Sequence, residues 1–404
     1  MENIKFATKS TCSFLRRHRR TIGIGVALGV GVAAFFSVRE ALQEAEAIQK
    51  QQEEDLQNQK RREKYLNRAK SEAVTAVLSF LPTLDRRLKD AVDINTPVRK
   101  LKALRKRAAQ KSSEDKKEEE AASVNPDEEE KNQLWDEVKI TAFTRWLVAF
   151  YCFGFLSLVM QLQSHIINRC LCREEELKEA KRKKSALSSE DTHPQPMELT
   201  YEVRHQLMSA TFDYLLGPGL LQLTADARQA VEIILPEWTV RNKTEVHYEG
   251  LASKLQELRK EIEVSHQQVL GYIIRPDTPN RSKGLAQKLL NETWDAIESP
   301  HFYVSLQEGL SITLENLCTF LKTGIFMGPP KTRKEEQEKN LDNCSNDNGS
   351  EIQLPTAAIG ALIPQIKSNT NKLLADDNGN LFLTEMMHAS SANYFCHEIF
   401  NQDD

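Results

Sequence analysis

The chain has 404 residues, of which 40% are hydrophobic and 28% are charged, and its net charge is only -4. These proportions suit a folded body with a sizeable core, and the small net charge excludes a bulk electrostatic affinity for nucleic acid. Glycine (16 residues) and proline (14 residues) are sparse, which favours long helices over many short strands. The seven cysteines are odd in number and scattered, so we expect a reducing compartment and no disulfide framework.

The N-terminal segment predicts a membrane anchor. Residues 1–20 are basic, and residues 21–38 carry no charge over a length that just suffices for a helix to cross a bilayer. A secretory signal peptide has a similar pattern, but no clear small-x-small cleavage site precedes Arg39 and a helical pattern continues behind it. We therefore expect a retained transmembrane helix at 21–38, followed by a polar helical stalk at 39–72.

Residues 73–404 predict a helical-bundle docking domain. Apolar residues recur every three or four positions after Ala73, and Pro82 is expected to end that helix or start a new turn. Thr96 followed by Pro97 is typical of a helix start. Charged, low-complexity segments are expected to form surface loops, and they lie near 105–131, 173–196, 275–284 and 328–353.

The other helical patterns lie between these loops. Gly217, Pro218 and Gly219 indicate a clear break between two of the helices. Helices are predicted at 132–172, 198–216, 220–235, 245–273, 284–298, 301–323, 355–375 and 381–400. No block of alternating strands and turns is found. The predicted fold class is all-α, an elongated helical bundle with an N-terminal transmembrane helix.

The longest predicted helix contains a second stretch that is long enough to cross a membrane. Residues 146–164 carry no charge. Lys139 and Arg145 lie on the same continuous helical pattern, however, and Gln161 and Gln163 make its last turn polar. We predict that 146–164 is a buried core helix, and a second membrane span is the alternative.

No catalytic or cofactor motif is found. The sequence has no phosphate-binding loop and no HExxH, CxxC or GxSxG motif. Cys170 and Cys172 form the only close cysteine pair, with only His165 near them as a further metal ligand. We expect a protein without catalytic activity, cofactor or metal that works by binding, although catalytic groups that converge from distant positions would leave no motif.

Short blocks in the right order resemble the peroxisomal biogenesis factor 3 family. The most specific block is Leu-Leu-Asn-Glu-Thr-Trp-Asp-Ala-Ile-Glu-Ser-Pro-His-Phe at 289–302. The other blocks lie at 14–20, 78–84, 134–145, 215–220 and 354–364. The resemblance implies a helical bundle on the cytosolic face of the peroxisomal membrane, where it binds a helix of the soluble chaperone-receptor peroxisomal biogenesis factor 19. That partner delivers newly made membrane proteins for insertion.

The resemblance also implies site residues. The family's basic targeting start matches Arg16, Arg17, His18, Arg19 and Arg20, and the Trp and Lys of its partner groove match Trp135 and Lys131. Neighbouring groove candidates are Leu134, Val138, Leu101 and Leu104. From helical spacing alone, Trp135 would sooner cap the core than bind a partner. An organelle-membrane tethering or division scaffold without an import role is the alternative function.

Overall fold

The computed structural model describes residues 31–114, 126–185, 199–240, 244–274, 284–326, 355–377 and 379–402. The chain divides into two compact units, Met1–Lys64 and Tyr65–Asp404, and helix α2 (Gly31–Ala91) contributes to both. Of the predicted membrane span, only residues 31–38 are described, and they are helical. Every buried hydrophobic side chain in the described residues belongs to the second unit.

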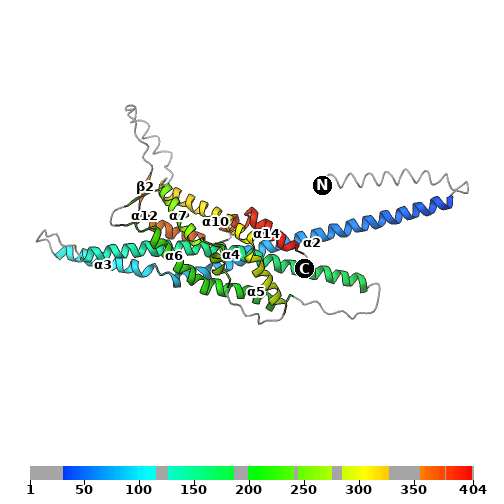
Figure 1. Ribbon diagram of the computed structural model, residues 1–404, viewed down its shortest axis with the longest axis horizontal. Coiled ribbons are helices and arrows are strands. Elements are labelled where there is room, and N and C mark those ends of the chain that lie inside the picture. The colour runs from blue at the N-terminus through cyan, green and yellow to red at the C-terminus, as the bar shows by residue number, and fades with distance from the viewer. Residues whose placement is uncertain are drawn as a thin grey trace, which may run out of the picture. The chain divides into compact units, whose positions relative to one another are not determined.

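Helix α4 (Pro126–Ser185) runs through the middle of the second unit (Figure 1). It is covered by α3 (Asn95–Glu114), α6 (Leu220–Ile234), α10 (Pro300–Leu321), α12 (Ile359–Leu373) and α14 (Ser390–Asn401). All of residues 146–164 are buried among these helices. The helix passes the length and hydropathy test for a membrane span, yet its most apolar window is 100% buried inside the protein. The predicted all-α class is confirmed.

The remaining elements complete the bundle. They are α5 (Tyr201–Tyr214), the π-helical turn η2 (Leu215–Gly219), α7 (Tyr248–Ile262), α8 (His266–Gly271), α9 (Leu285–Glu298), the π-helical turn η3 (Lys322–Phe326) and α13 (Leu381–Met387). In the described residues, β-structure is limited to β1 (Glu245–His247) and β2 (Thr356–Ala358). These strands pair antiparallel, with Val246 opposite Ala357.

The polar side chains of α4 bind distant parts of the bundle, which fits a protein core better than a lipid environment. Arg145 donates to Asp85 at 3.0 Å and Asn168 donates to Glu72 at 2.7 Å, so both join α4 to α2. Gln161 donates to the carbonyl of Met387 at 3.2 Å. Arg169 binds Glu292 and the carbonyl of Ile399. The predicted burial of 146–164 is therefore confirmed, and its polar last turn has partners within the protein.

Two of the predicted charged loops are wrong where the structure describes them. Helix α3 continues to Glu114 and α4 already begins at Pro126, so the whole described part of 105–131 is helical. Helix α4 also continues to Ser185, well into the segment 173–196. The exposed Lys178 pairs with the half-buried Glu174 at 2.6 Å, and such charges are compatible with a solvated helix as well as with a loop.

Three predicted helix boundaries also change. Helix α2 continues through Pro82, because Pro82 lies on the exposed side where water can solvate the carbonyl that loses its donor. Asp93 caps α3 in place of Thr96, accepting from the Asn95 amide at 2.8 Å. The expected break at Gly217 is a kink within η2, where the backbone (φ -116°, ψ -105°) leaves the helical region before α6 continues.

Candidate partner-binding site

The candidate site lies on the hairpin that α3 forms with the first turns of α4. The two helices pack against each other, and the guanidinium carbon of Arg105 lies 5.5 Å from the centre of the Trp135 ring. This is the range of a cation–π contact. The structure therefore brings the α3 candidates and the α4 candidates of the sequence to one place.

The predicted site residues differ in burial. Leu101 is 5% exposed and Val138 is 2% exposed, so both belong to the core and offer a partner no surface. Leu104, Leu134 and Trp135 are half-buried, and Lys131 is exposed. Trp135 and Leu134 pack against the core with part of their surface, so Trp135 caps the core and also borders solvent. The five targeting residues from Arg16 to Arg20 lie outside the described residues.

Charged groups hold α4 in place directly behind Trp135. The buried Lys139 donates to the carbonyl of Leu235 at 3.0 Å and lies 3.5 Å from Asp136. Burial lowers the pKa of Lys139, and the nearby Asp136 carboxylate opposes that shift. On the outer side, Glu137 binds Arg228 of α6 at 2.9 Å. These contacts fix the part of α4 that carries Trp135. The sequence analysis did not predict the contact between Arg105 and Trp135.

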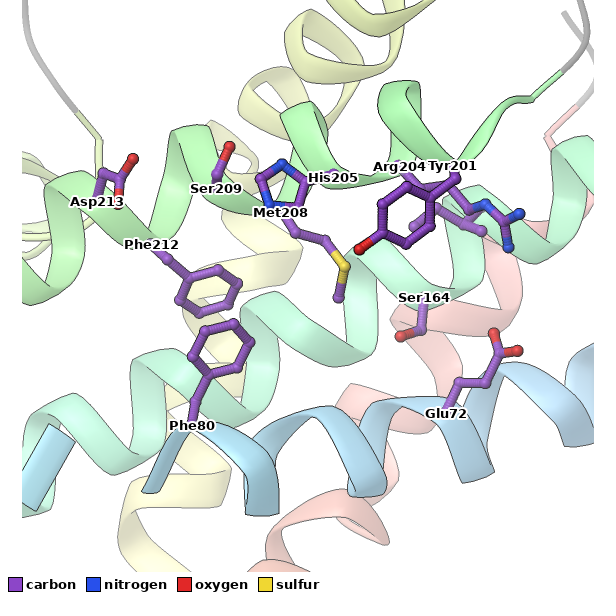
Figure 2. Close-up of a pocket in the computed structure, with 11 residues that line it drawn as sticks. Glu72, Phe80, Ser164, Tyr201, Arg204, His205, Met208, Ser209, Phe212 and Asp213 are labelled. Carbon is purple, nitrogen blue, oxygen red and sulfur yellow. The ribbon is translucent and has the colours of Figure 1, made fainter. Parts of the chain in front are cut away.

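A separate cavity of about 420 Å³ opens between α2, α4 and α5 (Figure 2). Its volume is in the range of small-molecule sites. Phe80 and Phe212 stack at one end, with ring centroids 4.2 Å apart. The lining includes both signs of charge: Glu72 and Asp213 as well as Arg204. The cavity therefore favours no particular charge of ligand. Its residues come from three helices, and the sequence offered no signal that they meet.

Reactive and metal-binding groups are not concentrated in the described residues. No group of three histidine, cysteine or acidic residues there could hold a metal ion. Cys152 and Cys396 are buried, and burial raises the pKa of both thiols, which leaves them as inert core residues. The geometry thus defines a helical-bundle protein whose predicted site is an aromatic surface suited to binding another protein.

The comparisons with known proteins agree with this class. The sequence model of the Peroxin-3 family matches residues 109–287. Peroxisomal biogenesis factor 3 of Bos taurus and that of Mus musculus are each 26% identical to the chain over 96% of both sequences. The Homo sapiens protein of the same name is 25% identical over 87% of both sequences. Over most of its length the chain is therefore similar to peroxisomal biogenesis factor 3 proteins, and over residues 109–287 to the Peroxin-3 family model.

Proposed function

We propose that this protein serves in peroxisome biogenesis as a docking receptor in the peroxisomal membrane. In this proposal, residues 21–38 anchor the chain and the second unit faces the cytosol. There it binds the soluble chaperone-receptor peroxisomal biogenesis factor 19, which delivers membrane proteins for insertion. The protein acts by binding and carries out no chemical step.

The observation that carries the proposal is the position of Trp135. Helix α4 is buried almost throughout from Val138 to Arg169, but Trp135 and Leu134 remain half-exposed beside α3. An amphipathic helix laid against this hairpin would cover the indole with its apolar side chains, as in other helix-in-groove complexes. Large aromatic residues at the centre of such interfaces commonly carry much of the binding energy. Lys131, on the same face of α4 one turn earlier, would act as a charge at the rim.

The test compares Trp135→Ala with Trp294→Ala, a matched change at another half-buried tryptophan on α9. Loss of Trp135 should weaken binding of the N-terminal helix of peroxisomal biogenesis factor 19 by roughly 2–4 kcal/mol, or about 30- to 1000-fold. Trp294→Ala should leave the dissociation constant within about threefold of the parent. Both are measured by titration of the labelled peptide, after circular dichroism has established that helicity and melting are unchanged.

Two results would contradict the proposal. If Trp135→Ala binds the peptide as tightly as the parent, Trp135 does not belong to the docking site. If the melting temperature falls sharply for Trp135→Ala, the residue acts in the core and not in binding. A parent chain that binds no such helix, yet links peroxisomes to another membrane, would favour the tethering function instead.

A further inference from the structure

The cavity between α2, α4 and α5 is separate from the candidate partner-binding site, and its surface is mainly apolar. Its walls include Phe80 of α2, Ile167 of α4, and Met208 and Phe212 of α5. Met208 and Phe212 point from α5 toward α2 (Figure 2). Along α5 the lining extends from residue 201 to residue 213, which is roughly 18 Å at 1.5 Å per residue. An elongated apolar cavity of about 420 Å³ suits a single hydrocarbon chain.

Arg204 of α5 is a half-buried cation in the lining of this cavity. Its Nε atom is buried and has no hydrogen-bond partner in the described structure. No ion pair of its guanidinium group is found among the described residues either. A buried donor without an acceptor is costly in free energy, and such a group in a native fold calls for an explanation. An anion bound in the cavity would supply both the missing acceptor and the missing counter-charge.

Two acidic residues also line the cavity, and their charges are balanced in other ways. Glu72 accepts hydrogen bonds from Arg68 and Asn168, both at 2.7 Å, and Arg68 is also its ion-pair partner. Asp213 is exposed at the other end of the cavity, where water can solvate its carboxylate (Figure 2). Taken as a whole, the lining favours neither sign of charge. Taken singly, Arg204 is the buried charge that lacks a partner.

The acidic residues of the neighbouring helical surface do not pair with this guanidinium group. Glu202, on the same helix, is exposed and accepts a hydrogen bond within α5. On α9, which packs against α5, Glu292 binds the buried Arg169 of α4. Asp295 and Glu298 of α9 are exposed. The described part of the chain therefore supplies apolar walls and an unpaired cation, and it leaves the anion to a ligand.

We propose that this cavity is a binding site for a long-chain carboxylate, such as a fatty acid. The carboxylate pairs with the guanidinium group of Arg204, whose N–H donors lie in one plane and match the two carboxylate oxygens. The hydrocarbon chain runs along Ile167 and Met208 toward the stacked rings of Phe80 and Phe212. The ligand thus pairs the buried donor and covers the apolar walls at the same time.

A carboxylate fits this lining better than other charged head groups. It carries one negative charge, which the single charge of Arg204 balances. A phosphate monoester carries about -1.5 to -2 charges at neutral pH. Its second charge would face Glu72 and Asp213 without a counter-charge, and a cationic head group would leave the Arg204 donor unpaired. The inference is independent of the proposed docking function, because the lining residues are not those of the candidate partner-binding site.

The experiment uses the full chain in phosphatidylcholine nanodiscs and a long-chain fatty acid with a photoreactive group near the middle of its chain. After irradiation at about pH 8, where carboxylates are ionised, mass spectrometry of the digested protein locates the labelled residues. Labelling is expected in α5, at or near Met208 and Phe212. The competitors are an unlabelled fatty acid, a fatty alcohol and an alkylamine of the same chain length, compared at equal mole fraction in the bilayer. The fatty acid should compete at least about tenfold more strongly than the alcohol, and the amine should compete most weakly.

The variants separate the charge of the site from its space. Arg204→Gln should lower the labelling of α5 by about tenfold or more, because a charge-assisted hydrogen bond is lost. Arg204→Lys keeps the charge without the planar donors, so its labelling should lie between that of Arg204→Gln and that of the parent. Met208→Trp keeps Arg204 but fills the cavity, and it should also lower labelling. Arg86→Gln, at an exposed arginine of α2 outside the lining, is the matched control and should label as the parent does.

Three results would overturn the inference. Labelling that is confined to residues outside the cavity would mean that the fatty acid only dissolves in the bilayer. Equal competition by the alcohol and the fatty acid would leave an apolar cavity that does not select an anion. Stronger competition by the alkylamine would mean that Glu72 and Asp213, and not Arg204, determine the charge of the ligand. The competitors are tested on the parent chain, so these results decide the question even if Arg204→Gln fails to fold.

Discussion

At the residue scale, His165 gives the bundle a defined sensitivity to acid. The side chain is fully buried, and its Nδ1 donates to the carbonyl of Gln161 at 2.6 Å, while Nε2 has no partner within the described structure. Burial lowers the pKa of His165 from 6.5 to about 4. His165 is therefore protonated near pH 6.5 in the unfolded chain but only near pH 4 in the folded chain. Because the unfolded chain binds the proton first, the folded state loses stability as the pH falls from about 6.5 to about 4.

The predicted loss from His165 is about 3 kcal/mol of unfolding free energy between pH 7 and pH 4. Denaturant unfolding of a truncated chain starting at residue 42 should show this loss, and His165→Gln should remove that part of the pH dependence. His388 is exposed and bonds a carbonyl in the same way, so His388→Gln is the control and should follow the parent. Parallel curves for the parent and His165→Gln would refute the assignment.

The partners of such buried groups could not be predicted from the sequence. The helical period indicated that Lys139, Arg145 and Arg169 lie on one long helix, but their acceptors are 60 to 230 residues away in the chain. The same holds at the candidate site. Trp135 and Lys131 were found through a family resemblance, whereas the contact of Trp135 with Arg105 depends on how α3 packs on α4.

At the scale of elements, the turn η2 depends on a glycine at position 219. A Cβ atom added there would lie 2.1 Å from the backbone carbonyl oxygen of Tyr272, which cannot move as a side chain can. Gly219→Ala should therefore lower the unfolding free energy by roughly 1–3 kcal/mol through overpacking. Gly271→Ala is the control, since no atom lies within 4 Å of a Cβ at that position. Equal melting temperatures for the two variants would contradict this packing.

The helices themselves were largely predictable where apolar residues follow the 3.6-residue period. The predicted helix at 220–235 corresponds to α6 (Leu220–Ile234), and the one at 284–298 to α9 (Leu285–Glu298). The errors arose where composition was used in place of periodicity. Runs of charge indicate contact with water, and an exposed helical segment such as residues 105–107 of α3 meets that condition as well as a loop does.

At the scale of the whole molecule, the orientation in the membrane is open to a direct test. We predict that protease added to intact peroxisomes digests the second unit. Under the positive-inside rule, the basic residues 1–20 would face the cytosol and the second unit would lie across the membrane. That rule describes insertion through the translocon, and we expect this anchor to insert by another route. Protection of the second unit, or glycan on Asn291, would contradict the cytosolic orientation.

A truncated chain starting at residue 42 should also be soluble, because the apolar window of α4 is covered by protein. Its persistence in the membrane fraction after alkaline carbonate washing would make α4 a second span.

The central position of α4 has a consequence for biosynthesis. Arg169 on α4 bonds Ile399 across 230 residues of sequence. At about 5–20 residues per second, a ribosome needs roughly 10–50 s to make that stretch. Throughout this interval the apolar helix α4, which is long enough to span a membrane, is only partly covered, because its covering helices α10, α12 and α14 have not all been translated. Newly made chains therefore need a chaperone that shields α4 from membrane insertion and aggregation until the C-terminal helices emerge.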